Sequence, residues 1–67
     1  MNKREFIKLI ERMKHVVHDK ELEWYLRDLK NHFDEDTVTR IEDYLFLLDD
    51  KTLLMTTEQF YNYIQSK

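Results

Sequence analysis

Apolar side chains recur every three or four residues along most of the chain, which is the spacing of one face of an α-helix. This pattern predicts helices over residues 2–17, 19–30 and 34–48, and a short last helix that begins at Thr56. Short connections between helices favour antiparallel neighbours. We therefore expect an all-α fold, in which three main helices and a short fourth form a compact bundle and residues 1–67 form a single domain.

Capping boxes mark the start of two of these helices. Asn2 stands three residues before Glu5, which is the spacing of a capping box, in which each side chain bonds the other residue's backbone amide. Thr56 and Gln59 repeat this spacing at the last helix. At the end of the second helix, Asn31 is predicted as a left-handed cap, because the chain has no glycine for that position.

Each predicted helix has a face that should point into the core. The third helix is expected to start at an Asp34 cap, with acidic residues in its first turn. The connection at residues 49–55 is expected to be held against the core by Leu53, Leu54 and Met55. The inward positions, in chain order, are Phe6, Leu9, Ile10, Met13, Val16, Val17, Leu22, Tyr25, Leu26, Leu29, Phe33, Val38, Ile41, Tyr44, Leu45, Leu48, Phe60, Tyr63 and Ile64.

Acidic residues occur in three pairs, each seven residues after the last. Seven residues are two helical turns, so on a helix each pair lies about 10.5 Å above the one before. Phe46 falls within this stripe, and Leu47 points away from the inward face. An aromatic ring framed by carboxylates is typical of a binding surface with an apolar anchor and a charged rim. The alternative is a solvated acidic face on which the tail or the last helix covers Phe46 and Leu47. The pairs are Glu35-Asp36, Glu42-Asp43 and Asp49-Asp50.

Trp24 is the second candidate anchor. On the second helix it points away from the face that carries Leu22, Leu26 and Leu29. Tryptophan is enriched at the energetic centres of protein interfaces, so we include Trp24 among the candidate binding residues. The alternative is that the first or the last helix packs over its ring.

The charge of the chain is unevenly distributed. The net charge is −3, but residues 1–20 carry six basic side chains against three acidic ones, and residues 21–50 carry ten acidic against three basic. A dipolar molecule of this kind suits head-to-tail contacts or a basic partner. Direct binding of nucleic acid by the whole molecule is not expected, because the third predicted helix would repel phosphates.

The sequence offers little for catalysis, cofactors or metals. It has no cysteine and no glycine, and its single serine is Ser66 near the end. Three histidines, His15, His18 and His32, could share a metal ion if the fold brought them together, but their spacing alone does not predict it. We expect neither an enzyme nor a bound cofactor or metal. No apolar run approaches the length of a membrane span, and the charged amino terminus indicates a cytoplasmic protein without membrane contact.

These features predict a small acidic protein-binding module that inhibits or regulates a protein partner with a basic surface, such as a nucleic-acid-binding protein. The chain has no glycine, proline or alanine, whose codons are GC-rich, and this fits an inhibitor encoded by a phage or plasmid of an AT-rich host. Two alternatives stay open. One is a dimeric DNA-binding or nucleoid-associated transcriptional regulator that uses the basic face of the first helix, and the other is a structural oligomerisation module, a homodimer included. The basic face consists of Arg4, Lys8, Arg12 and His15.

Overall fold

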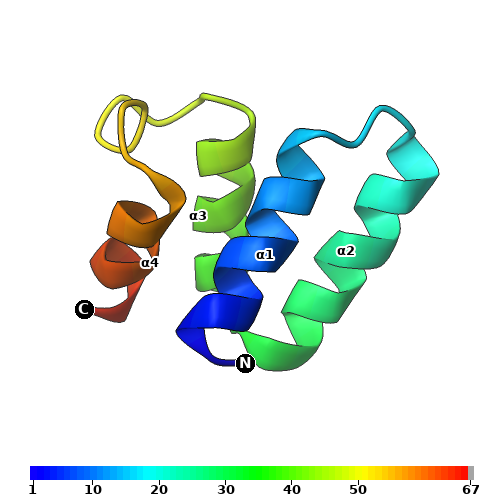
Figure 1. Cartoon of the computed structure of the whole chain (residues 1–67), viewed down its shortest axis with the longest axis horizontal. Coiled ribbons are helices and arrows are strands. Elements are labelled where there is room, and N and C mark those ends of the chain that lie inside the picture. Colours follow the sequence, from blue (N-terminus) through cyan, green and yellow to red (C-terminus); the bar gives the residue numbers. More distant parts are fainter. Residues whose placement is uncertain (67) are drawn as a thin grey trace.

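The computed structural model describes residues 1–66, which form four helices and no strand. The predicted all-α bundle of three main helices and a short fourth is confirmed. In Figure 1, α1 lies between α2 and α4 and contacts all three other helices, and α2 also packs on α3. The helices are α1 (Lys3–Lys14), α2 (Asp19–His32), α3 (Glu35–Leu45) and α4 (Thr57–Gln65).

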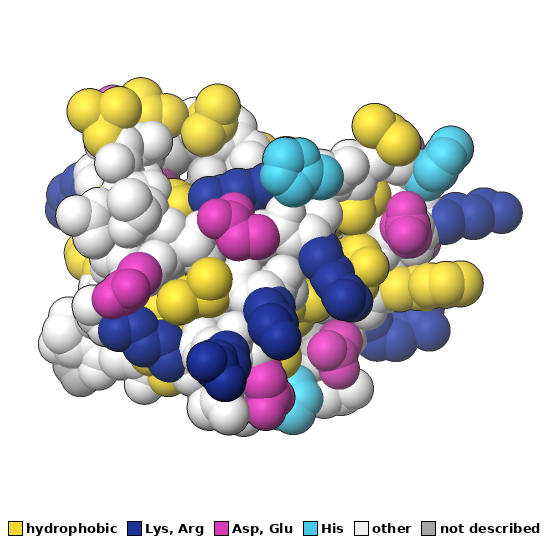
Figure 2. All heavy atoms as spheres, viewed as in Figure 1, with side chains coloured by type: hydrophobic (Ala, Val, Ile, Leu, Met, Phe, Trp, Pro, Cys, Tyr) yellow, Lys and Arg dark blue, Asp and Glu magenta, His cyan; other side chains and the backbone are white. Residues whose placement is uncertain are grey.

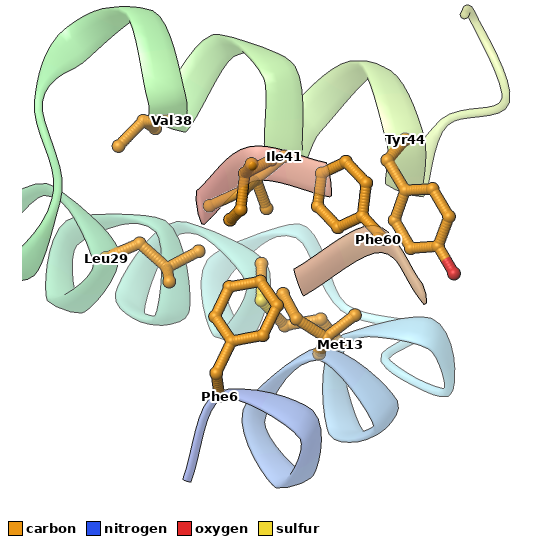
Figure 3. Close-up of a cluster of buried hydrophobic side chains, with 9 residues drawn as sticks. Phe6, Met13, Leu29, Val38, Ile41, Tyr44 and Phe60 are labelled. Atoms are coloured by element: carbon orange, nitrogen blue, oxygen red, sulfur yellow. The ribbon is translucent and has the colours of Figure 1, made fainter. Parts of the chain in front are cut away.

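The core is built from aromatic rings and branched side chains of all four helices (Figure 3). The rings of Tyr44 and Phe60 stack with centroids 4.1 Å apart and planes 6° from parallel. Phe33 meets the ring of Phe6 edge-on, with centroids 5.7 Å apart. Ring pairs of this kind stabilise a core by about 0.5–1.5 kcal/mol beyond the burial of their area. The side chains without any exposed surface are Phe6, Ile10, Leu29, Ile41 and Phe60.

The predicted caps hold the helix starts. The side chain of Thr56 accepts a hydrogen bond from the Gln59 amide at 3.2 Å, and the Gln59 side chain accepts one from the Thr56 amide at 2.9 Å, which completes the capping box. At α1, Asn2 Oδ1 accepts from the Glu5 amide at 2.8 Å. The second bond of the predicted box differs: the Glu5 carboxylate accepts a hydrogen bond from the Asn2 side-chain amide in place of the Asn2 backbone amide. Asp34 caps α3 as predicted.

Helix α1 ends at Lys14, three residues before the predicted end at residue 17. The amide of His15 bonds the Arg12 carbonyl and the amide of Val16 bonds the Met13 carbonyl, so the last turn tightens into i→i−3 bonds. Two consecutive β-branched valines, which are poor helix formers, favour this early end. Val16 is half-buried, but Val17 is 86% exposed, so its predicted inward position is wrong.

Helix α2 continues to His32, past the predicted end at residue 30. Asn31 lies inside the helix, so its predicted role as a left-handed cap is wrong. The capping residue is Phe33, whose backbone is extended with φ −132°. The extended backbone leads directly into the Asp34 cap of α3, while the Phe33 ring packs on Phe6, so no left-handed residue is needed here.

Helix α3 ends at Leu45, so its predicted continuation to residue 48 is wrong. Leu47 lies in the left-handed region with φ 59°. Its amide bonds the Tyr44 carbonyl at 3.3 Å, and the amide of Leu48 reaches back to the Asp43 carbonyl at 2.8 Å. This pair of bonds is a Schellman motif, which satisfies the last carbonyls of the helix and turns the chain away from its axis.

The loop between α3 and α4 is held by Thr52, which is 1% exposed. Its hydroxyl donates to the Asp49 carbonyl, and its own carbonyl accepts from the Met55 amide. Met55 is half-buried against the core, as predicted. Leu53 and Leu54 are exposed, as is Leu48 at the end of α3, and their predicted inward positions are wrong. The small polar Thr52 occupies the inward position of this loop in place of the leucines.

Candidate protein-binding surface

The early end of α3 breaks the predicted acidic stripe. Glu35-Asp36 and Glu42-Asp43 lie on the helix two turns apart, but Asp49-Asp50 lies in the following loop. The first pair is exposed at the start of α3, and the second is half-buried near its end. Because the eleven residues of α3 span about 16 Å, the first pair lies at the opposite end of the helix from Phe46. The structure therefore brings Phe46 together with the second and third pairs and not with the first.

Five large apolar side chains are exposed at the end of α3 and in the loop that follows, and we call them the 46–54 loop surface. Their exposed fractions range from 42% to 93%. Figure 2 shows hydrophobic side chains gathered over this loop, at the upper left of the view. Single exposed leucines are ordinary on protein surfaces, and a group of exposed large apolar side chains within nine residues is a candidate interaction site. The five are Phe46, Leu47, Leu48, Leu53 and Leu54.

Acidic side chains stand beside this apolar group. The Asp49 carboxylate accepts a hydrogen bond from the Lys51 amide at 3.0 Å and so fixes the turn at the tip of the loop. Asp50 is exposed, and Asp43 is half-buried one turn before Phe46. Lys51 is the one basic side chain within residues 46–54. The surface is therefore an apolar group with a predominantly acidic rim.

Leu47 occupies its place on this surface at an energetic cost. A left-handed backbone costs a residue with a side chain roughly 1–2 kcal/mol, and glycine or asparagine reduces that cost. The chain uses asparagine at residues 2, 31 and 62 but not here. The Leu47 side chain is mostly exposed, so burial in the core does not offset the cost. Strain of this kind at an exposed position is typical of a site where the side chain itself is needed.

A hydrogen-bond network ties the base of the loop to three helices, α1, α3 and α4. The Tyr44 hydroxyl donates to the Met55 carbonyl at 2.8 Å and accepts from Lys14 Nζ at 3.1 Å. Lys14 Nζ also donates to Thr57 Oγ1 at 2.9 Å and lies 3.4 Å from the Glu11 carboxylate. Partial burial lowers the pKa of Lys14, but its bonds to Tyr44 and the charge of Glu11 outweigh this effect and raise the pKa above 10.5.

Trp24, the other predicted anchor, is 68% exposed on α2, so the prediction that it points away from the core is confirmed. Helix α2 lies at the right of Figure 1, while the loop between α3 and α4 lies at the upper left. The structure therefore does not place Trp24 on the same surface as Phe46. The side chains around it, among them Lys20 and Glu21, are charged and exposed.

The histidines do not form a metal site in the described part of the chain. Within residues 1–66 there is no group of three or more histidine, aspartate or glutamate side chains that could hold an ion. His32 Nε2 instead lies 3.9 Å from Asp28 Oδ1, one helical turn earlier. None of the helices within residues 1–66 combines the length and apolar character needed to cross a membrane.

Three residues of the surface, Leu48, Leu53 and Leu54, were expected in the core. One signal in the sequence points to their exposure. Leu47-Leu48 and Leu53-Leu54 are adjacent doublets on either side of the polar run at residues 49–52. In an extended segment neighbouring side chains point in opposite directions, so each doublet predicts one exposed leucine, whereas the structure exposes both members of each doublet.

Comparisons of this chain with protein-family models, with curated proteins and with solved structures find no match.

Proposed function

We propose that this chain is a small protein-binding module that inhibits or regulates a protein partner through its 46–54 loop surface. The observation that carries this proposal is the exposure of five large apolar side chains on one hydrogen-bonded loop. Exposed apolar groups surrounded by charged residues have the anatomy of an interface, with anchors at the centre and a polar rim. Binding to a partner would cover these side chains and remove their area from water.

The acidic rim indicates the chemistry of the partner. Asp43, Asp49 and Asp50 outnumber Lys51 around the apolar group, so a partner with basic residues around an apolar pocket is complementary. A nucleic-acid-binding protein is one class of partner with such a surface. The anchors Phe46 and Leu54 would enter the pocket, while the carboxylates would steer the encounter. An inhibitor of this kind acts by occupying the surface that its partner uses for another ligand.

Site-specific cross-linking tests the proposal. A photo-reactive phenylalanine derivative at position 54 should form an adduct with another protein in a cell lysate, and the same group at position 23, exposed on α2, should not. The adduct at position 54 should decrease at high salt and in the variant Asp43→Lys/Asp50→Lys, because rim charges steer association and are screened by ions. Equal adduct yields at positions 54 and 23 would contradict the proposal.

Binding kinetics with the captured partner separate the two roles. Asp43→Lys/Asp50→Lys should slow association most at low ionic strength, and Leu54→Ser should mainly speed dissociation, since anchors determine residence time. The matched control is Glu23→Lys/Asp28→Lys on α2, which makes the same change in charge away from the loop. If this control slowed association as much as the loop variant does, net charge and not the loop surface would direct the encounter.

A further inference from the structure

Helix α1 carries three basic side chains that form no salt bridge within residues 1–66. Arg4, Lys8 and Arg12 are exposed and follow one another at four-residue spacing, so they line one face of the helix. Within residues 1–66 none of the three has an ion pair, whereas Lys14 on the same helix pairs with Glu11. Figure 2 shows dark blue side chains in a row across the middle of the molecule, where α1 lies in Figure 1. The three side chains form a row of basic residues on a chain whose net charge is −3.

An open groove of about 670 Å³ runs beside this row, between α1 and α2. Its apolar lining comes from Ile7 and Tyr25, which are half-buried, and from the two valines that follow α1. Lys8 and Arg12 stand along the α1 side of the groove, together with His15. Two acids also line it, Glu11 on α1, which pairs with Lys14, and Glu21 on α2, so Glu21 is the one lining acid without a salt bridge opposite Lys8 and Arg12.

The groove and the 46–54 loop surface are complementary. One is an apolar hollow with basic residues along its side, and the other is a projecting apolar loop with an acidic rim. They lie on different parts of the molecule, the groove between α1 and α2 and the loop beyond α3 and α4, so one copy cannot close on itself (Figure 1). Apolar matching with opposite charges at the rim is the condition for a specific contact.

We infer that the groove between α1 and α2 binds the 46–54 loop surface of a second copy of this chain. This inference rests on the proposed function, because it takes the same loop surface as the docking element. Leu48 and Leu54 of one copy contact the apolar lining in the other copy, and Asp50 lies near Lys8 and Arg12. The contact joins two different surfaces, so each pair keeps one free loop and one free groove, and further copies can add head to tail. Self-association at high concentration covers the partner-binding loop, and dilution exposes it.

Reciprocal charge reversal tests this arrangement. Sedimentation equilibrium of the purified chain at low salt should give a mass that rises with concentration, and high salt should reverse the rise. Lys8→Glu/Arg12→Glu should weaken association by about tenfold or more, and so should Asp43→Lys/Asp50→Lys. Asp49 stays intact in these variants because its carboxylate holds the loop turn. Mixed in equal amounts, the two variants should associate again, because each supplies the surface that now complements the other.

The control variant is Arg27→Glu/Lys30→Glu, which makes the same charge change on another face of α2 and should associate like the unaltered chain. Circular dichroism checks that every variant keeps its helices. An unaltered chain that stays monomeric at low salt, or variants that do not associate when mixed, would overturn the inference. If the chain stays monomeric while position 54 still cross-links another protein in a salt-dependent way, the inference fails and the proposed function stands.

The same variants report on nucleic acid as the ligand of the basic face. A mobility shift with duplex DNA at physiological salt should show no sub-micromolar complex, because the acidic α3 and loop repel phosphates. Tight DNA binding that Lys8→Glu/Arg12→Glu abolishes would reassign Lys8 and Arg12 to phosphate contacts and overturn the assignment of a second copy to the groove.

Discussion

The core and the 46–54 loop surface contain the same residue types, but these side chains are buried in the core and exposed in the loop. Phe60 and Leu29 are fully buried, whereas Phe46 and Leu54 are exposed. The buried pair lies on helices whose periodic pattern turns one face inward, and the exposed pair lies where the Schellman motif has already ended the helix. The comparison teaches that hydrophobicity alone does not decide burial, because the backbone must also direct the side chain to the core.

Truncation of the core should produce the largest effect. Phe60→Ala should destabilise the fold by roughly 3–5 kcal/mol, because it removes a ring that stacks on Tyr44 and leaves a cavity. A chain of this size has about that much stability in total, so the variant should be largely unfolded at 25 °C. Urea titration followed by circular dichroism measures the loss.

The matched truncation on the loop is Leu54→Ala, which should change the free energy of unfolding by less than about 0.5 kcal/mol. Leu54 is among the most exposed residues of the chain and contributes little to the core. A loss in Leu54→Ala close to that of Phe60→Ala would mean that the loop leucine is buried in solution. The contrast between core and loop surface would then be wrong.

An effect of opposite sign, smaller than that of Phe60→Ala, should come from Leu47→Gly. Glycine accepts a positive φ without steric strain, so this variant should stabilise the fold by about 1 kcal/mol while removing one exposed apolar side chain. Leu48→Gly is the control, because Leu48 has no positive φ and should gain nothing. Urea titration measures the free energy of unfolding of both variants. Equal changes in Leu47→Gly and Leu48→Gly would show that the backbone at Leu47 is not strained.

The smallest effect should appear at high pH. The pKa of Lys14 is raised above 10.5 in the folded state, so its stabilising bonds are present below pH 10.5 and are lost as the pH rises through the folded-state value. The difference in free energy of unfolding between the unaltered chain and Lys14→Met should therefore be constant near neutral pH and shrink above pH 10.5. The matched control is Lys8→Met, because the Lys8 side chain forms no salt bridge or hydrogen bond within residues 1–66, so its removal breaks none of these contacts.

The sequence predicted the helices well and the candidate surface in part. Helix starts were readable because Asn2, Asp34 and Thr56 are local capping signals that act within one turn. Helix ends were harder to predict, because a chain without glycine has no residue that marks a left-handed cap. At the end of α3 the left-handed position is occupied by Leu47, a residue type that does not predict it.

Helical periodicity predicted that Phe46, Leu47 and Trp24 point away from the inward face but left open whether another helix covers them, and in the structure all three are exposed. The exposure of Leu53 and Leu54 could not be predicted from periodicity, because it depends on which loop residue packs into the core. The core accepts Thr52, whose hydroxyl is satisfied by a carbonyl three residues away. That bond depends on the path of the folded loop, and hydrophobicity alone favours the leucines over a threonine at a buried position.

The burial of Thr52 has a thermodynamic consequence for any ligand of the loop. Fixing the backbone of one residue costs about 1–2 kcal/mol of conformational entropy. In this loop Thr52 and its bonds to Asp49 and Met55 fix the backbone when the chain folds, so much of the conformational entropy is lost during folding and not during binding. A ligand that docks on the neighbouring leucines therefore meets a loop that is already ordered, and its affinity is not reduced by ordering the chain on arrival. Complex formation should then resemble the docking of rigid surfaces more than the folding of a flexible segment around its target.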